Sequence, residues 1–150
     1  MPVLNAYLDA TFDDAVARTR NILREYGFLE LATTDVQAIS RAQIGAHIED
    51  YVILSICVPR LTARAVSTDR RAGLLLSWSV VIRSEGPGTL VEAADPALLV
   101  GAITIPDLES AAAQTRTILA RALDELRKPT AGEAVSEHGR PNRCGYEPSP

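Results

Sequence analysis

The chain has 150 residues, of which 47% are hydrophobic and 23% are charged, an ordinary composition for a globular protein. This length suits one domain and excludes two full cores, and a domain of this size needs neither disulfides nor a metal for stability. The formal net charge of −4 argues against a nucleic-acid partner, because surfaces that bind nucleic acid are normally basic.

The N-terminal sequence has neither the basic segment nor the long apolar stretch of a signal peptide. Apolar runs such as residues 52–56 are far too short to cross a bilayer. The only cysteines are Cys57 and Cys144, so we do not expect a structural disulfide. These features predict a cytoplasmic protein with no membrane partner.

The first elements alternate between strand and helix. Residues 2–8 have the pattern of a strand, and a helix over 12–26 follows, with Thr11 as its N-cap. Gly27 closes that helix, and residues 28–34 form the next strand.

A short helix that ends at Gly45 is expected over 36–44, before the clearest strand of the chain at 51–58. Pro59 ends this strand and suits the first turn of a helix that extends to about Asp69.

The second half of the chain predicts a hairpin and a closing helix. Strands over 74–83 and 89–93 are joined by the turn sequence 85–88, and a long amphipathic helix covers about 106–127. From residue 129 the sequence becomes rich in Pro and Gly and poor in large apolar side chains. We therefore expect one α+β domain over 1–128 and a disordered tail over 129–150.

The predicted fold is a mostly antiparallel sheet with helices on one face. In the strand 51–58 every second residue is apolar, so Val52, Leu54 and Ile56 should face the helices. The same alternation places a half-polar set on the opposite face. That set comprises Ser55, Cys57, Ser77, Ser79 and Arg83, with Glu30 and Asn5 as further members if their strands are in register.

The most reactive group in the ordered part is the thiol of Cys57, where a strand gives way to a helix. A helix N-terminus favours the thiolate, which makes Cys57 the best single catalytic candidate. A small apolar residue in a packed corner is the alternative interpretation, and it is favoured because no resolving cysteine or base is evident. Trp78 similarly belongs either to the core or to a pocket wall.

Other polar residues give weaker signals. His47 is the only histidine in the ordered part, so no metal site is expected. Arg60 and Arg64 lie one turn apart and could hold an anion, although a solvated helix face explains them better. No motif for nucleotide, metal or nucleophile chemistry occurs in the chain, and no cofactor is predicted.

Several segments of the chain together resemble the family called domain of unknown function 302. They are Thr11 to Val16, Tyr26 to Phe28, Asp35 to Ala38, Tyr51 to Pro59, Asp69 to Leu76, Val80 to Ile82 and Ala94 to Pro96. The resemblance covers roughly residues 5–127. It implies a compact α+β unit, β-α-β(4)-α in outline with extra short helices here, that forms homodimers.

The chain also departs from the pattern of that family. Cys57-Val58-Pro59 matches the family's Cys-x-Pro, but Leu76-Ser77-Trp78 stands where a Leu-Pro-Cys is frequent. Thr33 stands where a glutamate is common. The exchange of a thiol for a tryptophan indicates an altered pocket or dimer surface rather than conserved chemistry that needs two thiols.

Three functional hypotheses follow. The first is a homodimeric small-molecule-binding accessory protein or enzyme of a bacterial pathway. Its candidate ligand-binding residues are Ser55, Cys57, Trp78, Ser79, Arg83 and Glu30. The second is thiol-based redox or sulfur-handling chemistry at Cys57. The third is a structural dimerisation module.

Overall fold

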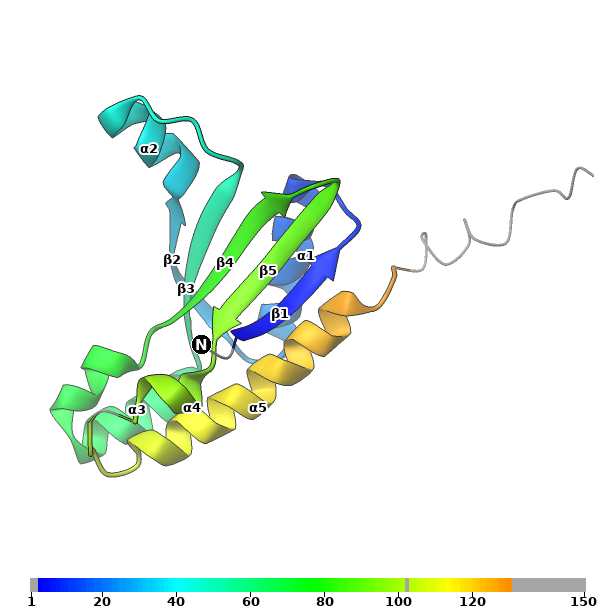
Figure 1. The fold of residues 1–150 in the computed structure, drawn as a ribbon. Coiled ribbons are helices and arrows are strands. Elements are labelled where there is room, and N and C mark those ends of the chain that lie inside the picture. The colour runs from blue at the N-terminus through cyan, green and yellow to red at the C-terminus, as the bar shows by residue number, and fades with distance from the viewer. Residues whose placement is uncertain (1–2, 102, 131–150) are drawn as a thin grey trace, which may run out of the picture.

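The computed structural model describes residues 3–101 and 103–130. Figure 1 shows a sheet with helices behind it and at its ends. The elements are β1 (Val3–Leu8), α1 (Phe12–Glu25), β2 (Leu29–Asp35), α2 (Val36–Ile44), β3 (Tyr51–Cys57), α3 (Pro59–Thr68), the 3-10 helix η1 (Arg70–Leu75), β4 (Trp78–Glu85), β5 (Gly88–Ala94), α4 (Pro96–Leu99) and α5 (Leu108–Arg127).

The five strands form one antiparallel sheet in the order β1-β5-β4-β3-β2. This arrangement confirms the α+β class, the antiparallel sheet and the long C-terminal helix expected from sequence. The predicted hairpin is β4–β5, in which Glu85 pairs with Gly88 across a two-residue loop. Gly86, the first residue of that loop, has φ 55°, a conformation that glycine adopts without strain and that tight hairpin turns require.

Alternate residues of the two central strands build the core. Leu54 and Ile56 of β3, with Val80 and Ile82 of β4, are at most 1% exposed. They lie on the sheet face that is covered by α1 and α5, and α1 lies behind the strands in Figure 1. The buried stripe of α5 consists of Leu108, Ala111, Ala112, Thr115, Leu119, Ala122, Leu123 and Leu126. The helix-facing side of β3 predicted from its alternation is therefore correct.

The helix boundaries follow local signals that are visible in the sequence. Thr11 caps α1 by accepting a hydrogen bond of 3.3 Å from the backbone N–H of Asp14. Gly45 ends α2 in the left-handed conformation at φ 64°. Pro59 occupies the first turn of α3, where its missing N–H leaves no intrahelical bond unmade.

Two predicted boundaries are wrong. The strand expected from residue 74 begins only at Trp78, because the side chain of Asp69 caps Arg71 N–H and starts the 3-10 helix η1. The last helix begins at Leu108 rather than at residue 106, since Asp107 before it has a left-handed φ of 65°.

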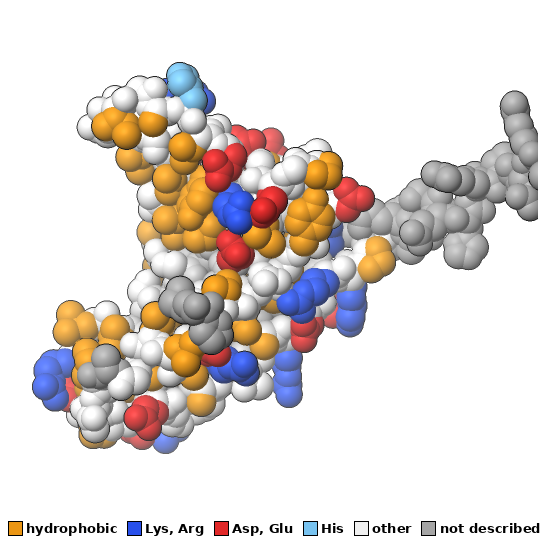
Figure 2. All heavy atoms as spheres, viewed as in Figure 1, with side chains coloured by type: hydrophobic (Ala, Val, Ile, Leu, Met, Phe, Trp, Pro, Cys, Tyr) orange, Lys and Arg blue, Asp and Glu red, His pale blue; other side chains and the backbone are white. Residues whose placement is uncertain are grey.

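Two helical segments extend away from the sheet and leave its other face uncovered. Helix α2 contacts β3, yet none of its residues is buried, and Ile44 at its end is 78% exposed. At the opposite end of the sheet lie α3 and η1. Figure 2 shows the uncovered face between these two projections, with hydrophobic side chains gathered over the strands.

The tail predicted over 129–150 lies outside the described residues, except for Pro129 and Thr130. Within the described part of the chain, no helix is long and apolar enough to span a membrane.

Gly88 provides a test of the close packing between β5 and β1. A Cβ at this position would collide with the carbonyl oxygen of Leu8 and lie 2.5 Å from the hydroxyl oxygen of Tyr7. We expect Gly88→Ala to lower the free energy of unfolding by roughly 1–3 kcal/mol, the usual cost of overpacking. Gly73→Ala is the matched control, since nothing lies within 4 Å of the added methyl group. Urea denaturation of both variants checks this expectation, and equal stability of the two would contradict it.

Candidate functional site

Three of the predicted site residues lie together on the uncovered sheet face. Ser55 of β3 and Ser79 of β4 are directly paired across the two strands. Arg83 lies further along β4, on the same face and opposite Tyr51. These residues form a shallow polar strip in the middle of a surface that is otherwise largely apolar.

The charge of Arg83 is already balanced by neighbouring carboxylates. Its guanidinium lies 2.9 Å from Glu85 and 3.5 Å from Glu92 of the adjacent strand β5. The group of three therefore carries a net charge of −1. An anionic ligand would have to displace one of these carboxylates before it could bind to Arg83, so this strip is a poor anion site.

Trp78 lies on the other side of the sheet. It pairs with Ile56 and is only 3% exposed, within the hydrophobic core beneath the helices. The indole therefore fills the core and does not line the polar strip. Of the two interpretations of Trp78 drawn from sequence, the structure supports the core residue.

Cys57 is buried as well, with 5% of its surface exposed. Strand alternation points it away from Ile56, as expected, but the side chain is buried at the end of the strand and is not exposed on the uncovered face. No hydrogen bond or ion pair in the described chain involves its sulfur. Because thiol chemistry requires an accessible thiolate, this placement gives the redox hypothesis no support.

Glu30 is not on the face where it was expected. It pairs with Ile56, whereas Leu29 pairs with Cys57, because Leu31 is an extra residue that forms a β-bulge between Glu30 and Ala32. Without this bulge, Glu30 would stand opposite Cys57 and share the uncovered face. The bulge reverses the alternation and turns the carboxylate toward α1.

On that side Glu30 forms a compact polar cluster with α1. Arg20 donates to both carboxylate oxygens, at 3.0 and 3.1 Å, and also to Thr33 Oγ1 at 2.9 Å. The hydroxyl of Thr33 in turn donates to Glu30 Oε1. Partial burial by itself raises the pKa of Glu30. The hydrogen bonds from Thr33 and Arg20, with the charges of Arg20 and Arg24, outweigh this effect and hold the pKa below its ordinary value.

The cluster borders a groove of about 330 Å³ between α1 and the β2 edge of the sheet. The groove is lined by Arg20, Leu23, Arg24, Phe28, Leu29, Glu30 and Ile56. Glu30 is the only predicted site residue among them. Arg20 and Arg24 were not predicted as site residues, although they are four residues apart and must therefore share one face of α1.

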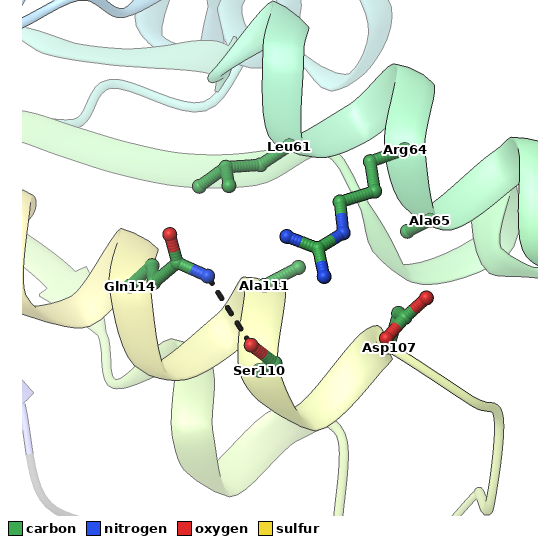
Figure 3. Close-up of a pocket in the computed structure, with 7 residues that line it drawn as sticks. All are labelled: Leu61, Arg64, Ala65, Asp107, Ser110, Ala111 and Gln114. Carbon is green, nitrogen blue, oxygen red and sulfur yellow. Dashed lines mark hydrogen bonds between the residues drawn. The ribbon is translucent and has the colours of Figure 1, made fainter.

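A second crevice, between α3 and the start of α5, is too tight to be a site. Figure 3 shows Arg64 extending from α3 toward α5, where Gln114 donates a hydrogen bond of 3.2 Å to Ser110. The space among these side chains does not admit a water molecule. In the described part of the chain, no three His, Cys, Asp or Glu side chains are grouped to hold a metal ion.

The polar cluster around Glu30 should make stability depend on pH. A carboxylate whose pKa is lowered by folding contributes stability above its unfolded pKa, about 4.3 for glutamate, and loses it as the pH falls through the folded value. We expect Glu30→Gln to cost about 0.2–1 kcal/mol at neutral pH, as for other partly exposed pairs, and this difference to shrink in acid. Glu49→Gln, in the exposed loop before β3, is the control. A difference for Glu30→Gln that is constant from pH 7 to 3 would contradict this assignment.

The burial of Cys57 predicts slow reaction with thiol reagents. In a Cys144→Ser background, we expect Cys57 to react with a disulfide reagent roughly a hundredfold more slowly in the folded protein than in urea. That ratio corresponds to a local opening free energy of about 2.8 kcal/mol. Stopped-flow absorbance measures both rates. Equal reaction rates in the folded protein and in urea would show that the thiol is accessible and would support the redox hypothesis.

Comparison with known proteins identifies the family and agrees with the fold. The family model described as "Domain of unknown function DUF302" matches residues 5–126. A crystal structure of an uncharacterised conserved DUF302 protein from Bacillus stearothermophilus is similar, with 25% sequence identity and a TM-score of 0.77. The alignment covers 85% of this chain and 99% of that one. No match was found among curated proteins. The chain belongs to the DUF302 family.

Proposed function

We propose that this protein acts as a homodimer that binds a small molecule, as an accessory protein or enzyme of a bacterial pathway in the cytoplasm. The observation that carries the proposal is the sheet face opposite α1 and α5, which no element of the described chain covers. A sheet of this kind is stable with one wet face, but that face is then normally polar.

The uncovered face is instead rich in apolar side chains. Val3 and Tyr7 of β1 are 37% and 46% exposed, and both lie on this face. Ile53 and Val81 form a half-buried pair at its centre, in the two strands β3 and β4. Exposed apolar side chains gathered on one face are typical of sites where proteins associate.

The charges on this face suit a symmetric contact between two copies. In a two-fold dimer the same patch serves both subunits, so it must be complementary to itself. Arg83 lies beside Glu85 and Glu92, so the patch carries both signs of charge close together. Rotation about a central axis can place the arginine of one subunit against a glutamate of the other.

The groove beside α1 supports the ligand-binding part of the proposal. Its volume of about 330 Å³ lies at the lower end of the range for small-molecule sites. The groove is on the helix side of β2, so a dimer formed through the opposite face leaves it open. A purely structural dimerisation module would use the same sheet face and bind nothing, and ligand titration distinguishes the two.

Substitution at the centre of the uncovered face tests the dimer. We expect Val81→Asp to weaken dimerisation about a hundredfold or more, because an unpaired charge buried in an interface costs about 3 kcal/mol or more. Sedimentation equilibrium measures the dissociation constant, and circular dichroism checks that the fold is retained. Thr117→Asp, on the exposed side of α5, is the control and should leave the dimer intact. A monomeric wild type, or an unchanged Val81→Asp dimer, would refute this interface.

A further inference from the structure

The groove between α1 and β2 combines an apolar floor with a charged rim. Leu23, Phe28 and Ile56 form the floor, and each of them is at most 5% exposed. Leu29 completes the lining at the edge of β2, although its pairing with Cys57 directs its side chain toward the other face of the sheet. This floor would favour a ring or short hydrocarbon chain, because each apolar atom that it covers leaves water.

The rim has one more positive than negative charge. Arg20 and Glu30 form a two-pronged ion pair and cancel one another. Arg24, one turn further along α1, has no ion pair in the described chain, and the only hydrogen bond of its side chain there is a long one of 3.5 Å to Asn21 Oδ1. The net charge of the lining is therefore +1, and the groove is complementary to a single negative charge.

Arg20 and Arg24 have guanidinium N–H groups that these interactions leave unused, and both residues lie on the same side of α1. Arg20 uses Nε and Nη2 for Glu30 and Thr33, so in the described structure its Nη1 forms no hydrogen bond. Glu30 and Thr33 hold this guanidinium in place, so its free edge is already oriented. Arg24 is exposed and free to turn toward a ligand. Two guanidinium groups above an apolar floor are well suited to a carboxylate, which accepts from planar donors.

We propose that this groove binds a small amphipathic monocarboxylate, an assignment that rests on the ligand-binding function proposed above. The apolar body lies on Phe28, Leu23 and Ile56. The carboxylate accepts hydrogen bonds from Arg24 and from Nη1 of Arg20. Glu30 and Thr33 hold the Arg20 guanidinium in place.

The test is a titration of the full-length protein with benzoate and with its neutral analogue benzamide, followed by two-dimensional ¹⁵N NMR. We expect benzoate to shift the amide signals of the end of α1 and of β2, and benzamide to bind about tenfold more weakly. That factor corresponds to the loss of one charge-assisted hydrogen bond.

Three variants test whether Arg24 supplies the positive charge that binds benzoate. Arg24→Gln should weaken benzoate binding about tenfold and leave benzamide binding unchanged, whereas Arg24→Lys should retain most of the affinity for benzoate. Arg121→Gln removes an exposed arginine on α5 and is the matched control, which should bind like the wild type. Arg24 is exposed and outside the core, so both of its variants should fold.

The possible outcomes separate the two proposals. Equal binding of benzoate and benzamide in the groove would overturn the carboxylate assignment but leave a small-molecule site. The same would follow if Arg24→Gln bound benzoate as tightly as Arg121→Gln does. If neither compound shifted signals of the groove, the site itself would be refuted, and the ligand-binding part of the proposed function would lose its support.

Discussion

The packing of one face of the sheet against α1 and α5 governs this molecule. Alternate side chains of β3 and β4, such as Leu54, Val80 and Ile82, are buried on this face. Burial of apolar surface, worth about 25 cal/mol per Å², is the main favourable term in folding. The packing of the sheet against these helices therefore determines which way each residue of β3 and β4 points. Ser55, Ser79 and Arg83 face outward because their neighbours along the chain must face inward.

Because the helices pack on one face of the sheet, the apolar side chains of the opposite face remain exposed. With both α1 and α5 on one side, the described chain has no element left to cover the other, although several of its residues are apolar. Helix α2 does not fold back over it and buries none of its own residues. In the homodimer that we propose, each subunit would cover the exposed sheet face of the other.

The edge strand β2 determines where the charged rim of the groove lies. Every residue of β2 is exposed, and its bulge at Leu31 changes the facing of Glu30 relative to the rest of the strand. The same bulge brings the carboxylate to Arg20 and so creates the charged rim of the groove. Edge strands tolerate such irregularities because they have a hydrogen-bonded neighbour on one side only.

Local and periodic features of the fold could be predicted from the sequence by itself. The cap at Thr11, the helix end at Gly45, the start of α3 at Pro59 and the inward set of β3 depend on neighbouring residues, and all of them are correct. The α+β class follows from the same patterns. The 3-10 helix before β4 was missed because its signal, the capping side chain of Asp69, competes with an apolar run that resembles a strand.

The site was decided by the tertiary structure. The six candidate residues separate into an exposed strip, a buried tryptophan, a buried thiol and a carboxylate on the opposite face. Cys57 is buried although strand alternation directs it toward the uncovered face, and no local pattern predicts this burial. A single inserted residue reverses the side-chain alternation of a strand, and only the hydrogen-bonded partner β3 shows where that insertion lies.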